Sequence, residues 1–263
     1  MPRIPEEHLN CVATLFIKDA GITLANSTSF LVEYAEKFGA NKISRYLVTC
    51  VHCIEKAPVS VDFVTGESMN LNNDLWKKDP TGNDVAAMDV TDILPQTISR
   101  RRLPFLSKTI DVDPPYREGD LGDDIYMLGL HSDENLAKRG AHLRARFGNV
   151  SAWASETRPI RQGNGAVKKS HIGDMRSKGG FSGAPVFIIP ETLDQNASAT
   201  PSQFGIHSDQ FQEPVQVNTP VFSGRIDVPS SMTIIVPWWA LDFIKTDSEF
   251  LAARIARESH DRD

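Results

Sequence analysis

The chain is dominated by short runs of apolar and β-branched residues, each bounded by polar or glycine-containing turns. The clearest runs are residues 11–17, 30–32, 48–53, 59–64, 125–129, 186–189, 204–208 and 231–236. Segments with a helical period are few. Closely spaced short strands with turn signals between them are typical of all-β folds. We therefore predict an all-β fold, and within that class a barrel.

A helix is expected only near the C-terminal end. Pro237 suits the first turn of a helix, where the missing N–H would have no partner anyway. The apolar residues that follow share one face, namely Trp238, Leu241 and Ile244. We expect this face to pack on the second half of the fold. The spacing Thr246-x-x-Glu249 fits a capping box and predicts a further helical stretch.

Composition and charge exclude two classes of partner. The chain has 263 residues, enough to bury a substantial core, and its 28 basic and 34 acidic residues give a formal charge of −6. A nucleic-acid-binding protein needs a basic surface, so no nucleic acid is expected as a partner. The N-terminus lacks the apolar region of a signal peptide, and no apolar stretch reaches the length of a membrane span. We therefore expect no membrane contact.

The stretch Gly179–Ile189 places a serine between glycines. Glycines on both sides of Ser182 let the backbone turn tightly and bring bare N–H groups close to a bound carbonyl. A serine hydroxyl becomes a good nucleophile only where a base removes its proton and nearby donors hold the oxyanion. The apolar run that follows predicts a strand that fixes the turn. Taken alone, the pattern also fits a hairpin turn with a solvated serine.

Two upstream segments supply a base and an acid. His52 lies at the end of the apolar run Tyr46–Ile54, and Asp84 precedes the apolar run Val85–Val90. The order histidine, aspartate, serine is that of the chymotrypsin-type catalytic triad. This order predicts that the three side chains act together.

Three motifs around these residues resemble those of the trypsin-like serine peptidases. They are Thr49-x-x-His52-Cys53, Asp84-Val-Ala and Gly180-Phe-Ser182-Gly183-Ala-Pro-Val. The resemblance extends from about Cys11 to about Ile244 and is greatest to the bacterial branch that lacks disulfides. It implies two six-stranded antiparallel β-barrels of the chymotrypsin type with a C-terminal α-helix.

The same resemblance implies a division of the chain and of its chemistry. Residues 1–112 would form the first barrel, with His52 and Asp84, and residues 113–263 the second, with Ser182. In such an enzyme the histidine takes the serine proton and later protonates the leaving amine, while the aspartate holds the imidazole. The implied activity is that of a serine endopeptidase acting on a polypeptide substrate, with no cofactor and no metal.

The oxyanion donors implied by the resemblance are the amides of Gly180 and Ser182. One departure from the secreted trypsins lies between them. Those enzymes carry an aspartate before the serine, which pairs with a new N-terminus after zymogen cleavage, and here the position is Phe181. We therefore expect no activation by that ion pair.

Specificity is predicted from the residues around the expected S1 pocket. The candidates for substrate binding are Arg176, Ser177, Gly205, His207 and Ser208. Glutamate-specific bacterial endopeptidases and picornavirus-type cysteine proteases place a histidine at the position of His207, so the resemblance implies Glu or Gln at P1. The alternative, in which His207 packs on its strand and binds nothing, stays open at this point.

The chain contains three cysteines, Cys11, Cys50 and Cys53. Secreted trypsin relatives usually pair the cysteine after the catalytic histidine with an earlier one, but none lies between Cys11 and Cys50. We interpret all three as reduced thiols and predict a cytoplasmic protein. The spacing Cys50-x-x-Cys53 also fits a metal or redox pair, although no second pair of ligands accompanies it.

Two other protein classes could also explain the serine motif. An α/β-hydrolase needs Gly-x-Ser-x-Gly followed by a helix, whereas here Ala184 is the fifth residue and a strand is expected next. The remaining alternative is a catalytically silent trypsin-like fold that binds peptides or regulates a partner protein. The sequence does not identify a regulatory partner.

Overall fold

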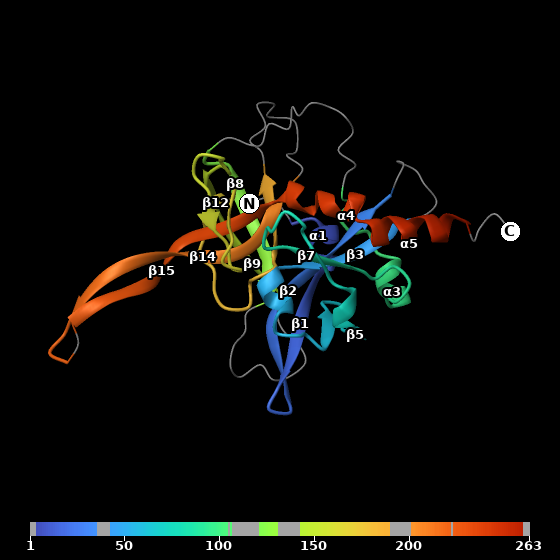
Figure 1. Cartoon of the computed structure of the whole chain (residues 1–263), viewed down its shortest axis with the longest axis horizontal. Coiled ribbons are helices and arrows are strands. Elements are labelled where there is room, and N and C mark those ends of the chain that lie inside the picture. The colour runs from blue at the N-terminus through green and yellow to red at the C-terminus, as the bar shows by residue number, and fades with distance from the viewer. Residues whose placement is uncertain are drawn as a thin grey trace.

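The computed structural model describes residues 4–35, 43–104, 106, 121–130, 143–189, 201–221 and 223–259. Strands dominate it, and they form a sheet and a barrel that lie side by side (Figure 1). The all-β prediction with a C-terminal helix is confirmed. The predicted boundary between residues 112 and 113 lies outside the described residues.

The first half of the chain folds into a seven-stranded antiparallel sheet with the order β5-β4-β1-β2-β3-β7-β6. Its strands are β1 (Val12–Asp19), β2 (Ile22–Tyr34), β3 (Ser44–Thr49), β4 (Ser60–Phe63), β5 (Ser68–Asn70), β6 (Lys77–Lys78) and β7 (Ala86–Asp89). Its short helices are α1 (Glu6–Asn10), α2 (Val51–Ile54), η1 (Asn73–Leu75) and α3 (Gln96–Ser99). The sheet has one strand more than predicted, and among the described residues its end strands β5 and β6 do not pair with each other.

The second half forms a closed six-stranded barrel with the order β12-β15-β14-β13-β8-β9, as the resemblance implied. Its strands are β8 (Asp124–Leu130), β9 (Leu143–Ala152), β12 (His171–Asp174), β13 (Pro185–Ile189), β14 (Ser202–Asn218) and β15 (Ser223–Pro237). A separate small hairpin, β10 (Ile160–Arg161) with β11 (Val167–Lys168), leaves the barrel between β9 and β12.

The two halves share one apolar core. Phe30 and Leu47 of the sheet belong to the same buried cluster as Tyr126, Phe187 and Val236 of the barrel. A second, smaller cluster fills the inside of the barrel. Because this core spans the junction, it fixes the barrel relative to the sheet. The loops at the junction therefore have fixed positions relative to one another.

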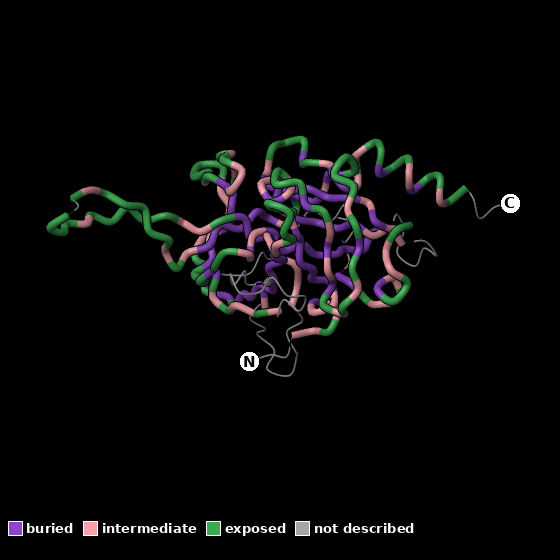
Figure 2. Tube along the Cα trace, turned by 90° about the horizontal axis from the view of Figure 1, so that it is seen from below, coloured by how far each residue is buried: buried purple, intermediate pink, exposed green. Residues whose placement is uncertain are grey.

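Strands β14 and β15 continue beyond the barrel as a two-stranded arm, made of residues 212–218 and 223–229 (Figures 1 and 2). Both faces of the arm are largely exposed. The register pairs Val215 with Ile226 and Glu213 with Val228, so the apolar side chains share one face. Two register shifts in β14, at His207/Asp209 and Gln210/Gln212, separate the arm from the barrel.

The C-terminal segment consists of η2 (Trp238–Asp242), α4 (Phe243–Thr246) and α5 (Ser248–Ser259). Leu241 and Ile244 are fully buried, as their spacing predicted. The predicted capping box is wrong, because Asp247 accepts hydrogen bonds from the amides of Glu249 and Phe250 and so caps α5. None of the described helices has the length and apolar character that crossing a membrane requires.

Helix α5 packs on the first sheet, whereas the expected packing on the second half concerned the face of Trp238, Leu241 and Ile244. Phe250 meets the ring of Tyr46 edge-on, with centroids 5.0 Å apart. Arg254 is buried and donates to Tyr46 Oη and to the Ile244 carbonyl, both at 2.9 Å. The guanidinium therefore joins the helix to β3 and caps the preceding turn at the same time.

Candidate active site

Helix α2 positions His52 at the end of β3. Cys50 adopts an extended conformation (φ −79°, ψ 151°) and is the N-cap residue, after which a single helical turn begins. The Thr49 hydroxyl donates to the Thr28 carbonyl at 2.8 Å and ties the end of β3 to β2. The turn therefore leaves a fixed strand end, and His52 projects where the sheet meets the barrel.

Asp84 is held by a loop that folds around another aspartate. The carboxylate of Asp79 accepts hydrogen bonds from the amide and hydroxyl of Thr81 and from the amide and side chain of Asn83, at 2.6–3.1 Å. Aspartate commonly organises turns in this way, by accepting from backbone groups a few residues on. The loop delivers Asp84, which is fully buried, beside His52.

His52 and Asp84 form a tight pair. The imidazole Nδ1 donates to Asp84 Oδ2 at 2.7 Å, and the His52 amide donates to Oδ1 at 3.2 Å. The Ser208 hydroxyl also donates to Oδ2, at 2.6 Å. Burial raises the pKa of this carboxyl, but the hydrogen bonds from His52 and Ser208 outweigh burial and lower it. Asp84 is therefore a carboxylate at neutral pH.

The protonation of His52 follows from two neighbours. Burial lowers the pKa of the imidazole, but the hydrogen bonds with Asp84 and with Cys53 outweigh burial and raise it to about 10. The Cys53 sulfur lies 3.6 Å from Nε2. In this arrangement the free site therefore favours the imidazolium form.

The hairpin of β10 and β11 covers the pair, although the polar, glycine-rich sequence of residues 158–169 is typical of a plain surface loop. Gln162 is buried, and its side-chain oxygen accepts from the Asp84 amide at 2.6 Å. The Gly163 amide donates to the Ser208 hydroxyl at 2.8 Å. A methyl group at Gly163 would lie 2.7 Å from His52 Nδ1 and 2.9 Å from Asp84 Oδ2, so only glycine fits there.

Ser182 sits in the glycine turn that precedes β13. Gly183 has a φ of +84°, and a methyl group on it would lie 2.2 Å from the Thr28 carbonyl oxygen, so the backbones of the two halves touch here. The Ser182 hydroxyl is oriented toward the Ser208 carbonyl oxygen, 3.5 Å away. No hydrogen bond joins it to His52, although both residues are among those described.

Two backbone amides beside the serine have no hydrogen-bond partner in the part of the chain that the structure describes. They are the N–H groups of Gly180 and Ser182, the two positions predicted as oxyanion donors, and neither donates a hydrogen bond to another described residue. The peptide between them is held from the other side, because the Thr28 hydroxyl donates to the Gly180 carbonyl at 2.7 Å. Gly180 has a φ of +97°, a conformation that glycine adopts readily.

His207, the predicted reader of the P1 residue, is only 2% exposed. Both of its ring nitrogens are buried, and neither has a hydrogen-bond partner among the residues described. Burial lowers the pKa of the ring to about 4, so the imidazole is neutral at neutral pH. Its carbonyl accepts from the Gly183 amide at 2.8 Å, which places its strand next to the Ser182 turn.

The other predicted substrate residues differ in position. Ser177 is buried with its hydroxyl 3.5 Å from the Lys178 carbonyl, and Arg176 is exposed. Gly205 allows close approach of strands, since a methyl group there would lie 2.3 Å from the Val236 carbonyl oxygen. The Ser208 hydroxyl donates a hydrogen bond to Asp84, so this side chain positions the carboxylate of the candidate triad.

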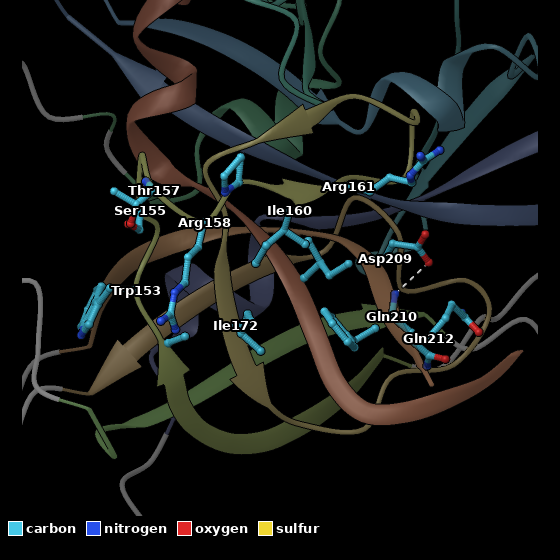
Figure 3. Close-up of a pocket in the computed structure, with 14 residues that line it drawn as sticks. Trp153, Ser155, Thr157, Arg158, Ile160, Arg161, Ile172, Asp209, Gln210 and Gln212 are labelled. Atoms are coloured by element: carbon cyan, nitrogen blue, oxygen red, sulfur yellow. Dashed lines mark hydrogen bonds between the residues drawn. The ribbon is translucent and has the colours of Figure 1, made fainter. Parts of the chain in front are cut away.

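A pocket of about 880 Å³ is lined by residues that follow Ser208 along β14 and precede Gln162 in the hairpin (Figure 3). Asp209, Gln210 and Gln212 line it from one side, and the segment after β9, including Trp153 and Arg158, lines it from the other. The Gln210 amide donates to the Asp209 side chain at 2.7 Å (Figure 3). The pocket thus combines apolar walls with polar groups on the strand next to Ser208.

Comparison with known proteins finds similarity in the fold only. No protein-family model matches the sequence, and no curated protein matches it. The fold is similar to the MamO protease domain of Magnetospirillum magneticum in its apo form, with a TM-score of 0.49, 15% identity and coverage of 92% of this chain and 97% of that one. It is also similar to Rv3671c of M. tuberculosis H37Rv, solved as an inactive serine-to-alanine mutant, with a TM-score of 0.46, 14% identity and coverage of 95% and 87%. Likeness at this level does not say which residues act.

Proposed function

We propose that the protein is a serine endopeptidase that uses Ser182, His52 and Asp84. The observation that carries the proposal is the hydrogen bond between His52 Nδ1 and the buried Asp84 carboxylate, which also accepts a hydrogen bond from Ser208. The pair lies in the same site as a serine turn in which two amides have no partner among the described residues. A buried aspartate that fixes an imidazole, together with free N–H groups at a serine, is the arrangement that acyl transfer requires.

The reaction starts when the Ser182 hydroxyl turns from the Ser208 carbonyl toward His52 Nε2, a rotation about one side-chain bond. Hydrogen bonds between nucleophile and base are often long before substrate binds. His52 in its neutral form takes the hydroxyl proton while the oxygen attacks the scissile carbonyl carbon. The amides of Gly180 and Ser182 hold the resulting oxyanion. The imidazolium then protonates the leaving amine, and water hydrolyses the acyl-enzyme by the same steps.

For specificity we propose Glu or Gln at P1, bound by His207 with Ser177. The support is the pair of unpartnered ring nitrogens on His207, because buried polar groups normally have a partner. A neutral imidazole offers one N–H donor and one acceptor. That donor suits a side-chain amide or carboxylate oxygen of the substrate, and the Ser177 hydroxyl would add a second donor.

The test of the peptidase is labelling with a fluorophosphonate probe followed by peptide hydrolysis. The parent should label at Ser182, and Ser182→Ala should abolish labelling and lower turnover by roughly four to six orders of magnitude. Ser99→Ala, in helix α3, is the matched control and should label as the parent does. If Ser182→Ala hydrolyses peptides as fast as the parent, the proposal is wrong.

A catalytically silent peptide-binding module is the second candidate. The observation that favours it is the Ser182 hydroxyl, which is not hydrogen-bonded to His52. A folded parent that binds peptides but neither reacts with the probe nor hydrolyses them would establish the silent module. Labelling at Ser182 would exclude it.

A further inference from the structure

Three potential metal ligands lie together next to the candidate triad. A ring nitrogen of His52 and the sulfurs of Cys50 and Cys53 all lie within 4.8 Å of one another, and Nε2 is 3.6 Å from Cys53 Sγ. Both cysteines are buried, unpaired thiols, as is Cys11 elsewhere in the core. The proposed hydrolysis uses neither sulfur.

The backbone brings the two thiols to the same side of α2. Cys50 is the N-cap residue, and the Cys53 amide donates to the Cys50 carbonyl at 3.2 Å, which closes the first turn of the helix. Residues three apart on a helical turn are neighbours on one face. His52 lies between them in sequence, and its side chain, 23% exposed, is the part of the cluster that solvent reaches.

The imidazole is already oriented as a metal ligand. Its Nδ1 donates to Asp84, which leaves Nε2 as the nitrogen with a lone pair once the ring is neutral. Metal-bound histidines commonly donate their other N–H to a carboxylate, because this fixes the ring and makes the ligating nitrogen more basic. Asp84 therefore stands where such a supporting carboxylate would be found.

We propose that Cys50, His52 and Cys53 bind Zn²⁺. Tetrahedral zinc, with bonds of about 2.3 Å to sulfur and 2.0–2.1 Å to nitrogen, holds its ligand atoms roughly 3.5–3.8 Å apart. The three atoms need to close by at most about 1.3 Å from their present separations to reach this geometry. Both thiols lose their protons on binding, and two thiolates neutralise the charge of the buried ion. The fourth position stays open.

Zinc at this site would regulate the proposed peptidase, a part of the inference that rests on the proposed function. The same nitrogen, His52 Nε2, must take the serine proton in hydrolysis and coordinate the metal. Binding and catalysis therefore exclude each other, and zinc acts as a reversible inhibitor. When the metal is removed, His52 Nε2 is again able to accept the proton of Ser182.

The binding test uses the full chain, reduced and metal-free, titrated with Co²⁺ as a spectroscopic substitute for Zn²⁺. One equivalent should bind with a thiolate-to-cobalt charge-transfer band and the visible bands of tetrahedral cobalt, and Zn²⁺ should displace it. Cys50→Ser/Cys53→Ser should lose the charge-transfer band, and His52→Ala should weaken binding. Cys11→Ser is the matched control, because it removes the third thiol outside the cluster, and it should bind as the parent does.

Activity is read separately, by probe labelling at Ser182 with and without Zn²⁺. Zinc should block labelling of the parent and of Cys11→Ser, and a chelator should restore it. An unchanged cobalt spectrum in Cys50→Ser/Cys53→Ser, or a Cys50–Cys53 disulfide that forms in place of metal binding, would overturn the zinc site while leaving the peptidase standing. Stoichiometric cobalt binding to a parent that never labels would keep the site and reject the peptidase.

Discussion

The two sides of the candidate site differ in how completely their polar atoms are bonded. On the side of the sheet, both oxygens of Asp84 accept hydrogen bonds, and Gln162 accepts from its amide. On the side of the barrel, the amides of Gly180 and Ser182 and both ring nitrogens of His207 have no partner among the described residues.

This contrast separates two tasks. A charge that must persist through a reaction needs fixed, complete hydrogen bonding, because an incompletely solvated carboxylate in the interior is costly. Groups that will receive a substrate need to be free before it arrives, and they cost stability until then. We interpret the bonded side as the permanent part of the site and the unbonded side as the part that substrate completes.

The largest loss of activity is expected when Asp84, at the centre of the bonded side, is replaced. Asp84→Asn keeps the size of the side chain but presents an amide to His52 and favours the wrong tautomer, so kcat should fall about 10⁴-fold. Hydrolysis of a peptide substrate measures it. Asp74→Asn, at an exposed carboxylate in η1, is the control, and an Asp84→Asn variant with parental kcat would contradict the assigned role.

A smaller loss of activity is expected from a substitution in the hairpin of β10 and β11, which covers His52 and Asp84. Gly163→Ala introduces a methyl group that meets both His52 and Asp84, so the hairpin or the imidazole must move. A displacement of about 1 Å at a catalytic group can cost about 10²-fold in rate. Turnover should fall with little change in the folded fraction at room temperature. Val167→Ala, at an exposed position of the same hairpin, should leave turnover unchanged; equal losses in both variants would mean that the hairpin only needs to be folded.

On the unbonded side, replacing His207 should lower the selectivity for the P1 residue, whereas an apolar replacement should keep or raise the thermal stability. His207→Ala should reduce the preference for Glu or Gln at P1 by about 1–3 kcal/mol, measured as kcat/KM over a P1 peptide library. His207→Phe should lose the same preference yet melt at or above the parental temperature, because an apolar ring needs no partner. A parent that prefers a basic or large apolar P1 residue would reduce His207 to a packing residue.

The smallest effect is expected in the pH profile. Hydrolysis needs neutral His52, and its raised pKa means that kcat/KM should rise with pH from neutral into the alkaline range and fall as the ring protonates below its pKa. Cys53→Ala removes one of the two contacts that raise this pKa, so the acidic limb should move to lower pH. Cys11→Ala should leave the limb in place, and a limb that moves upward in Cys53→Ala would contradict the role given to the thiol.

Local patterns predicted much of the fold, because strand alternation and turn residues act over short distances. They identified the strand that leads to His52 and the strand that begins after Ser182, although His52 itself lies in a helical turn. They also placed the buried face of the C-terminal segment at Leu241 and Ile244. They missed its packing on β3. Arg254, a charged residue in an amphipathic helix, finds its partner Tyr46 more than two hundred positions away, and no local pattern encodes that distance.

The same limit applied to the candidate site. Gln162 and Gly163 lie in a stretch that the sequence alone marks as a surface loop, because glutamine, glycine and asparagine in succession are typical of a turn. The contacts of Gln162 with the Asp84 amide and of Gly163 with His52 depend on how the barrel sits against the sheet. Ser208 was assigned to substrate by its place in the motif, yet its hydroxyl binds Asp84. These contacts join residues from both halves of the fold, so the local sequence of either half does not predict them.

The arm formed by β14 and β15 has a mechanical consequence. Strand β14 carries His207 and Ser208 and then continues into the solvent, so any sideways pull on the arm acts on the strand that steadies Asp84. Two register shifts, one at Ser208 itself and one at Gln210/Gln212, interrupt the ladder, and irregularities of this kind locally bend a strand. We expect these shifts to behave as joints that absorb the swing of the arm. The Asp84 carboxylate would then be insulated from motion at a tip roughly 30 Å away along the strand.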